Sequence, residues 1–267
     1  MNRSFTFIAL LLFLTASVAI AGADDPKARA IMEKVDARFD GDNGTSSMEM
    51  TLIDKRGKKR IRKIVTFMKD FGEDTYRILF FQSPADVKDT GFLTYDYDDP
   101  EKDDDQWLYL PALRKTKRIA TSDKSGSFMG SDFNYSDMTS KDLEDYDFKL
   151  MKESKVRGAK VWLIESTPRS RDVIDETGYT KSVIFVRQDN YFVVRVVHWV
   201  HGGTRLKYLD VVKLAQIDGV WTGLEVTMTT KQGKKTLHKT VLKYSGVKYN
   251  QNHDDNIFTI RRLEKGL

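Results

Sequence analysis

Four histidines, His198, His201, His238 and His253, are the side chains best suited to acid–base catalysis or metal binding in this chain. His198 and His201 stand three residues apart at the end of a strand-like run, so their side chains face opposite sides of a strand and do not converge on a metal. We therefore expect the histidines to be exposed or to pack within strands.

Nucleophilic catalysis has equally little support. The chain has no cysteine, which excludes cysteine nucleophiles, thiolate metal sites and disulfides together. Ser127 lies in the stretch Gly-Ser-Phe-Met-Gly at 126–130, one position early for a nucleophile elbow, and no strand–turn–helix frame surrounds it. The motifs predict a protein that is not an enzyme and that needs no metal or cofactor.

An acidic run between two strand-like stretches is the pattern closest to a calcium site, because calcium prefers clustered carboxylate oxygens. An EF-hand loop needs glycine at its sixth position, where Glu101 stands. A solvated hairpin loop is the better interpretation. The seven carboxylates of the run are Asp96, Asp98, Asp99, Glu101, Asp103, Asp104 and Asp105.

Two basic clusters could recognise an anionic partner. Residues 55–63 hold seven Lys and Arg in nine positions, and a second cluster lies at 114–118. Each is either a solvated hairpin or a docking surface for anionic lipid headgroups or an acidic partner, since clustered Lys and Arg attract both. The docking candidates are Lys55, Arg56, Lys58, Lys59, Arg60, Arg114, Lys115, Lys117 and Arg118.

The first 23 residues have the layout of a secretory signal peptide. A charged start precedes a mostly apolar run at 5–20, and small residues at 21–23 form a cleavage site before Asp24. The run is too short for a membrane helix, and no later stretch reaches the roughly 18 apolar residues that one needs. We expect residues 24–267 to form one domain exported to the periplasm. Export and interspersed charges argue against nucleic-acid binding, despite a net charge of +5 and a pI near 9.1.

One amphipathic helix is predicted at the start of that domain. Asp25 is a suitable N-cap, Pro26 suits the first helical position, and Gly41 can end the helix. The apolar residues that share one helical face are Ala28, Ile31, Met32, Val35 and Phe39.

Most of the remaining chain alternates as strands do and is rich in β-branched and aromatic residues. Strands in series without helices between them exclude a doubly wound α/β fold and predict one antiparallel sheet coiled into a barrel or half-barrel. The predicted strands span residues 48–52, 61–68, 76–81, 91–97, 107–110, 160–165, 180–187, 192–200, 206–214, 221–229, 237–244 and 257–260.

Residues 114–146 interrupt this series with an insertion that is long for a strand connection and includes a short helix expected around 137–146. The insertion is too apolar for disorder, so we expect a lid or plug packed on the sheet. Its apolar residues are Phe128, Met129, Phe133, Tyr135 and Met138.

The apolar composition allows two kinds of interior. Aromatic residues make up 11% of the chain, and nine Met are many for a β protein. Met adapts to irregular apolar volumes, and a coiled sheet under a lid can enclose acyl chains, with each buried methylene contributing about 0.8 kcal/mol. Composition alone favours the other interior, an ordinary packed core.

Two motifs resemble a known family. Residues 107–114 read Trp-Leu-Tyr-Leu-Pro-Ala-Leu-Arg, followed by Lys117-Arg118-Ile119, and residues 127–133 read Ser-Phe-Met-Gly-Ser-Asp-Phe. Both resemble the outer-membrane lipoprotein-sorting proteins of the LolA-like superfamily, in particular a branch often encoded beside RND-type exporters. The resemblance extends over essentially the whole chain after the signal peptide.

The resemblance implies an unclosed β-barrel with helices across its open mouth, whose apolar concave face receives the acyl chains of lipoproteins or other lipids in the periplasm. LolA also has an Arg-Pro pair tied to lid closure, and that arginine is not carried over because no Pro here follows an Arg. The residues that we expect to line such a cavity are Met48, Met50, Leu52, Phe67, Phe80, Leu93, Tyr95, Trp107, Tyr109, Phe128, Met129 and Phe133.

Two functions follow as hypotheses. In the first, the protein is a periplasmic carrier that accepts a lipid or lipoprotein, with an inner-membrane RND-type exporter as its donor, and moves it toward the outer membrane. In the second, the barrel has a solid core, and the protein is a non-catalytic accessory subunit of such an exporter that docks through residues 55–63.

Overall fold

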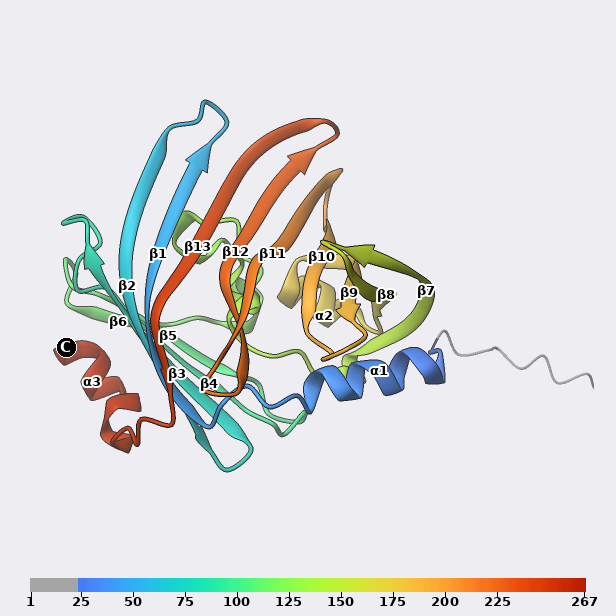
Figure 1. Ribbon diagram of the computed structural model, residues 1–267. Helices are drawn as coiled ribbons and strands as arrows, with labels where there is room; N and C mark the ends of the chain where they lie inside the picture. The colour runs from blue at the N-terminus through green and yellow to red at the C-terminus, as the bar shows by residue number, and fades with distance from the viewer. Residues whose placement is uncertain (1–23) are drawn as a thin grey trace, which may run out of the picture.

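The computed structural model describes residues 24–267, so the signal peptide expected at 1–23 lies outside the described part of the chain. The strands form a single thirteen-stranded sheet that curls without closing (Figure 1). Their order is β6-β5-β4-β3-β2-β1-β13-β12-β11-β10-β9-β8-β7, so β6 and β7 are the two edges. The predicted half-open antiparallel sheet is therefore confirmed. In residues 24–267, no helix is long and apolar enough to cross a membrane.

The sheet consists of two meanders joined where the first strand pairs with the last. β1 pairs antiparallel with β13, and within each meander every strand pairs with its neighbours along the chain. The first meander is β1 (Asn43–Asp54), β2 (Lys59–Phe71), β3 (Asp74–Ser83), β4 (Gly91–Asp96), β5 (Asp105–Leu110) and β6 (Lys115–Arg118). The second is β7 (Tyr146–Val156), β8 (Ala159–Pro168), β9 (Tyr179–Arg187), β10 (Val193–Val200), β11 (Arg205–Ile217), β12 (Val220–Gln232) and β13 (Lys235–Tyr249).

Turn chemistry sets the hairpin between β1 and β2. The Asp54 carboxylate accepts hydrogen bonds from the backbone N–H groups of Arg56 (2.8 Å) and Lys58 (3.0 Å). Gly57 takes a φ of 81°, which side-chain-bearing residues rarely adopt. Because β1 and β13 pair as far as Asp54 and His238, the β12–β13 hairpin ends beside this one, as Figure 1 shows.

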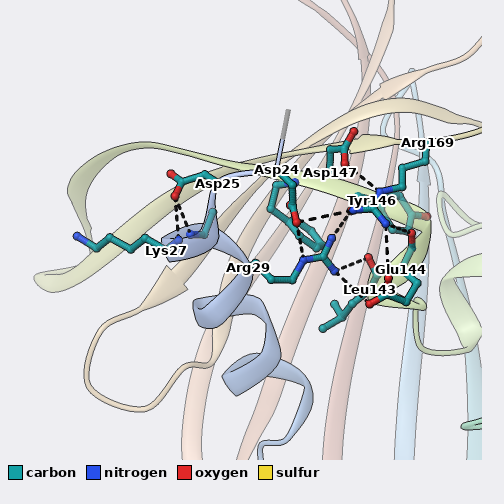
Figure 2. Close-up of polar contacts among 11 residues, drawn as sticks. Asp24, Asp25, Lys27, Arg29, Leu143, Glu144, Tyr146, Asp147 and Arg169 are labelled. Carbon is teal, nitrogen blue, oxygen red and sulfur yellow. Dashed lines mark hydrogen bonds and ion pairs between the residues drawn. The ribbon is translucent and has the colours of Figure 1, made fainter. Parts of the chain in front are cut away.

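The predicted first helix is present as α1 (Pro26–Asp36), with Pro26 at its first position, but it ends at Asp36, before the expected end at Gly41, and Phe39 lies exposed outside it. The Asp25 carboxylate caps it by accepting from the N–H groups of Lys27 and Ala28. Figure 2 shows how the helix is fixed to the sheet: Arg29 pairs with Asp24 and donates to the carbonyl oxygens of Leu143 (2.8 Å) and Tyr146 (2.7 Å).

The C-terminal region differs from the prediction. Residues 257–260 were expected to form a strand, but they belong to the 3-10 helix η5 (Asp255–Phe258) and to the start of α3 (Ile260–Lys265). The Asp254 carboxylate caps η5, and the Thr259 hydroxyl accepts from the Arg262 N–H at 3.1 Å and caps α3. This local capping overrides the β-like run of apolar side chains.

Three other elements were missed by the sequence patterns. Two are strands, β6 within the expected lid and β7 directly after it, and the third is the short helix α2 (Arg171–Thr177). Residues 119–145 connect β6 to β7 and are called the lid segment below. It contains only 3-10 turns, among them η2 (Phe128–Gly130), η3 (Tyr135–Met138) and η4 (Leu143–Asp145), so the helix expected around 137–146 is replaced by the last two.

Candidate functional site

The sheet buries apolar side chains on both of its faces. The lid segment packs on the inner face, where Phe128 and Phe133 join residues such as Met50, Leu79 and Leu242 in one apolar cluster. The C-terminal segment packs on the outer face, where Phe258 and Leu263 join a separate cluster. Gly91 permits this second contact, because a Cβ there would lie 2.6 Å from Leu263 Cδ1.

A cavity of about 380 Å³ lies between the inner face and the lid segment. Most of its lining is apolar and comes from six strands and the lid. Burial raises the pKa of the Tyr244 phenol in its wall, so this side chain stays neutral. The apolar lining residues are Met48, Met50, Met68, Leu79, Phe128, Phe133, Met138, Phe192, Val211, Val226, Leu242, Tyr244, Val247 and Tyr249.

The twelve expected lining residues divide between the two faces. Met48, Met50, Phe128 and Phe133 line the cavity, and Leu52 and Met129 belong to the inner-face cluster beside it. The other six lie on the outer face, so placing them in the cavity was wrong. They are Phe67, Phe80, Leu93, Tyr95, Trp107 and Tyr109.

The error has a simple origin in strand geometry. Successive side chains of a strand point to opposite faces, and strands β3 to β5 are apolar on both. Ile78 and Leu79 on β3 are both buried, yet Leu79 lines the cavity and Ile78 packs on the outer face. Alternation therefore defined the two sets of residues but not which set faced the cavity.

Three polar side chains of the inner face fasten the lid segment by donating to its backbone carbonyl oxygens. Arg62 donates to Met129 at 2.6 Å, Arg77 to Met138 at 3.1 Å, and Gln106 to Tyr135 at 2.9 Å. Burial lowers the pKa of the Arg62 guanidinium, which nevertheless remains charged near neutral pH. No sequence pattern pointed to these three side chains, since their partners are backbone atoms.

Asp132 fastens the lid segment from its opposite side. Its buried carboxylate accepts hydrogen bonds from the hydroxyls of Thr230 (2.5 Å) and Thr240 (2.7 Å), and the Nδ1 of His238 lies 2.7 Å from it. The backbone N–H of Asp132 also donates to the Thr240 hydroxyl at 2.9 Å. Thus the lid is tied to β2, β3 and β5 in one meander and to β12 and β13 in the other.

The remaining histidines take structural positions in strands and loops. His198 is buried, stacks on Tyr179 with ring centroids 4.2 Å apart, and contacts the Ser182 hydroxyl at 2.7 Å. Burial moves the pKa of His198 well below its usual range, so it is neutral. His253 contacts the Thr45 hydroxyl at 2.9 Å, and His201 contacts Arg171 at 3.0 Å.

The acidic run connects β4 to β5 and uses several of its carboxylates locally. Asp104 accepts from the Tyr97 N–H at 3.0 Å, and Asp105 pairs with Arg118. Burial, with a smaller contribution from Asp96, raises the pKa of Asp104 to about 6.

The two basic clusters lie apart in the sheet. Lys55, Arg56, Lys58, Lys59 and Arg60 form the exposed tip of the β1–β2 hairpin. The second cluster, Arg114, Lys115, Lys117 and Arg118, belongs to β6 and the turn before it, and β3, β4 and β5 separate it from β2. The exposed lysines that do adjoin the first tip are Lys234 and Lys235, at the turn of the β12–β13 hairpin.

The chain is similar to a protein family and to solved structures over most of its length. A family model described as "uncharacterized protein" matches residues 73–265. A solved domain from Vibrio parahaemolyticus, described as an outer membrane lipoprotein-sorting protein domain, is 31% identical with a TM-score of 0.80, over 89% of this chain and 98% of that one. A DUF1329 family protein from Desulfovibrio piger gives 29% identity and a TM-score of 0.80, again over 89% and 98% of the two chains.

A more distant structure agrees in fold. It is a LolA superfamily protein from Nitrosomonas europaea, 20% identical with a TM-score of 0.65, over 88% of this chain and 98% of that one. A search of curated proteins gave no match. The chain is therefore similar, over nearly all of its described residues, to solved proteins with this half-open sheet.

Proposed function

Because this chain belongs to the outer-membrane lipoprotein-sorting proteins of the LolA-like superfamily, we propose that it is a carrier that shields lipid acyl chains in its apolar cavity. The observation that carries this proposal is the cavity of about 380 Å³ between the inner face of the sheet and the lid segment. A packed core would leave no such volume beside Met50, Phe128 and Phe133.

The cavity matches the physical needs of an acyl chain. Each methylene transferred from water to an apolar lining contributes about 0.8 kcal/mol, so the free energy of transferring one acyl chain is many times the thermal energy. The lining methionines Met48, Met50, Met68 and Met138 can adapt to chains of different shape, because Met has flexible torsions and a polarizable sulfur. We expect binding that depends on apolar contact area more than on one acyl structure.

The lid segment provides the means of loading and release. Its ties through Arg62, Arg77 and Gln106 are hydrogen bonds to carbonyl oxygens, which water can replace once the segment moves. An acyl chain or a partner protein that binds the open form of the lid better than the closed form shifts the population toward the open form. Transfer then needs no covalent chemistry.

The proposed place of action is the periplasm. The signal peptide expected at 1–23 would export the chain, and the carrier would take its cargo from the inner membrane toward the outer membrane. We also propose that an RND-type exporter donates the cargo, because the two motifs resemble a family branch that is often encoded beside such exporters.

Native mass spectrometry of the protein purified without detergent tests the carrier function. We expect a stoichiometric adduct that solvent extraction identifies as an acyl-containing lipid or lipoprotein, because an apolar cavity of this volume is costly to leave facing water. A bare protein mass, together with no uptake of an added fluorescent fatty acid, would contradict the proposal. That result would favour the second function, an accessory subunit with a solid core.

The paired hairpin tips are the proposed docking surface for an anionic membrane surface. Replacing Lys58 and Lys59 by Glu should weaken binding to vesicles containing phosphatidylglycerol at least about tenfold, since each basic residue near such a surface contributes about 1 kcal/mol. Vesicle co-sedimentation measures this, and 0.5 M salt should remove the difference between the variants.

The matched control reverses two other exposed lysines, Lys149 and Lys152 on the edge strand β7. It makes the same change in net charge, so a general effect of charge would weaken vesicle binding equally in both double variants. Equal binding by the two would remove the hairpin tips from the proposal.

A further inference from the structure

A second cavity, of about 510 Å³, lies on the other side of the lid segment and has a different character. Within residues 130–134 of the lid segment, Phe133 lines the apolar cavity, and its neighbours Asp132 and Asn134 line the second one. Ser127, Ser131 and residues from α2, β11, β12 and β13 complete a lining in which most of the residues are polar. One stretch of chain therefore separates an apolar compartment from a polar one.

A buried cation is the central feature of the polar cavity. Lys207 on β11 is only 8% exposed, and within residues 24–267 no Asp or Glu forms an ion pair with it. Lys124 is a useful contrast, because it is just as buried but has the Glu176 carboxylate at 2.6 Å. Removing an ammonium from water costs several kcal/mol unless a partner of opposite charge replaces the lost hydration.

The neighbours of Lys207 hold its ammonium in place without neutralising it. The Nζ donates to the Asn134 side-chain oxygen at 2.6 Å and lies 3.5 Å from the Tyr179 hydroxyl. Asn134 is oriented by donating its amide to the Thr177 carbonyl at 2.8 Å, and Tyr179 by donating to Asp137 at 2.9 Å. An ammonium has three N–H donors, so one remains for a ligand.

The two carboxylates that line this cavity have partners other than Lys207. Asp132 is already satisfied by Thr230, Thr240 and His238, and Asp175 pairs with Arg171 at 2.9 Å. Arg205, exposed at the rim and two residues before Lys207 on the same strand, adds a second cation. A guanidinium above an ammonium is an arrangement that recognises phosphate oxygens.

We propose that the polar cavity binds the anionic headgroup, a phosphate monoester, of the amphiphile whose chain the protein carries, with Lys207 as its counter-ion and Arg205 at its rim. This rests on the proposed carrier function, because it assigns the headgroup of the same cargo. The lid segment would then contact the ligand on both sides, through Phe133 toward the chain and Asn134 toward the headgroup.

Isothermal titration calorimetry of the full chain with octyl phosphate, octyl glucoside and inorganic phosphate tests this assignment. We expect octyl phosphate to bind at least about tenfold more tightly than octyl glucoside, since a hydrogen bond between two charged groups is stronger than one to a neutral hydroxyl. Lys207→Met should remove that preference and leave octyl glucoside affinity unchanged. Arg205→Gln, at an exposed position that cannot disturb the core, should reduce the preference about threefold or more.

Lys213→Met is the matched control, since Lys213 lies on the same strand but is exposed outside the cavity. Octyl phosphate that binds Lys207→Met as tightly as the unchanged protein would overturn the headgroup site. Inorganic phosphate that binds as tightly as octyl phosphate would also overturn it, in favour of a free anion. If octyl glucoside fails to bind while octyl phosphate binds through Lys207, the anion site stands and the apolar carrier function fails.

Discussion

Replacing Met50 by Asp is expected to lower acyl-chain affinity at least about a hundredfold, because the new carboxylate would lie against hydrocarbon and lose its hydration when a chain binds. Met50 lies at the centre of the inner face, is 2% exposed, and lines the apolar cavity. Fluorescent fatty-acid titration measures the loss. Met50→Leu, which keeps the volume and the apolar character, should change the affinity less than about threefold.

A second pair of variants separates loss of the cavity from loss of the fold. Met68 and Phe67 are neighbours on β2 and both are half-buried, but Met68 lines the cavity and Phe67 packs on the outer face against His253. Met68→Asp should abolish uptake, and Phe67→Asp should retain it, with both proteins folded by circular dichroism. Equal uptake by these two variants would show that the inner-face cavity is not where the chain binds.

Replacing Asp132 by Ala is expected to lower the free energy of unfolding by about 3 kcal/mol, because it leaves the buried Thr240 hydroxyl and the partly buried donors of Thr230 and His238 without their acceptor. The lid segment should loosen more than the sheet, since this carboxylate is its tie to β12 and β13. Urea unfolding measures the first effect, and hydrogen exchange of the amides in residues 125–135 measures the second.

Asp123 provides the matched control within the same lid segment. Its ion pair with Lys117 at 3.1 Å is exposed on both sides, so Asp123→Ala should cost less than about 1 kcal/mol and leave exchange unchanged. If the lid amides of the Asp132→Ala variant exchange no faster than those of the Asp123→Ala variant, the proposed fastening by Asp132 is wrong.

The lid segment is therefore held by two sets of contacts. Arg62, Arg77 and Gln106 reach single carbonyl oxygens, whereas Asp132 gathers several donors in a buried position. Releasing either set leaves a buried charge without its partners, the Arg62 guanidinium in the first set and the Asp132 carboxylate in the second.

Local patterns in the sequence were sufficient for most of the elements. The Asp25-Pro26 start, the 3.6-residue spacing after it and the alternation of most strands predicted α1 and eleven of the thirteen strands, because capping and side-chain periodicity depend on neighbours along the chain. The same reasoning predicted the lid, since its aromatic and Met residues need an apolar partner. The short strand β6 and the highly charged β7 lacked such a pattern, and the C-terminal helices were predicted as a strand because their β-like run was given more weight than their caps.

Only the tertiary structure decided which side of the sheet forms the site. Strands β3 to β5 are apolar on both faces. Residues 254–265 pack on the outer face and the lid segment packs on the inner face, and this packing determined which face lines the cavity. The polar contacts were equally beyond sequence reasoning: Asp132 meets Thr240 from 108 positions away, and Lys207 meets Asn134 from 73. Sequence alone determined the strands and the family resemblance, which arise from local spacing and motifs. The cavity and its charges arise from long-range packing, because a curled sheet brings together residues that no local pattern relates.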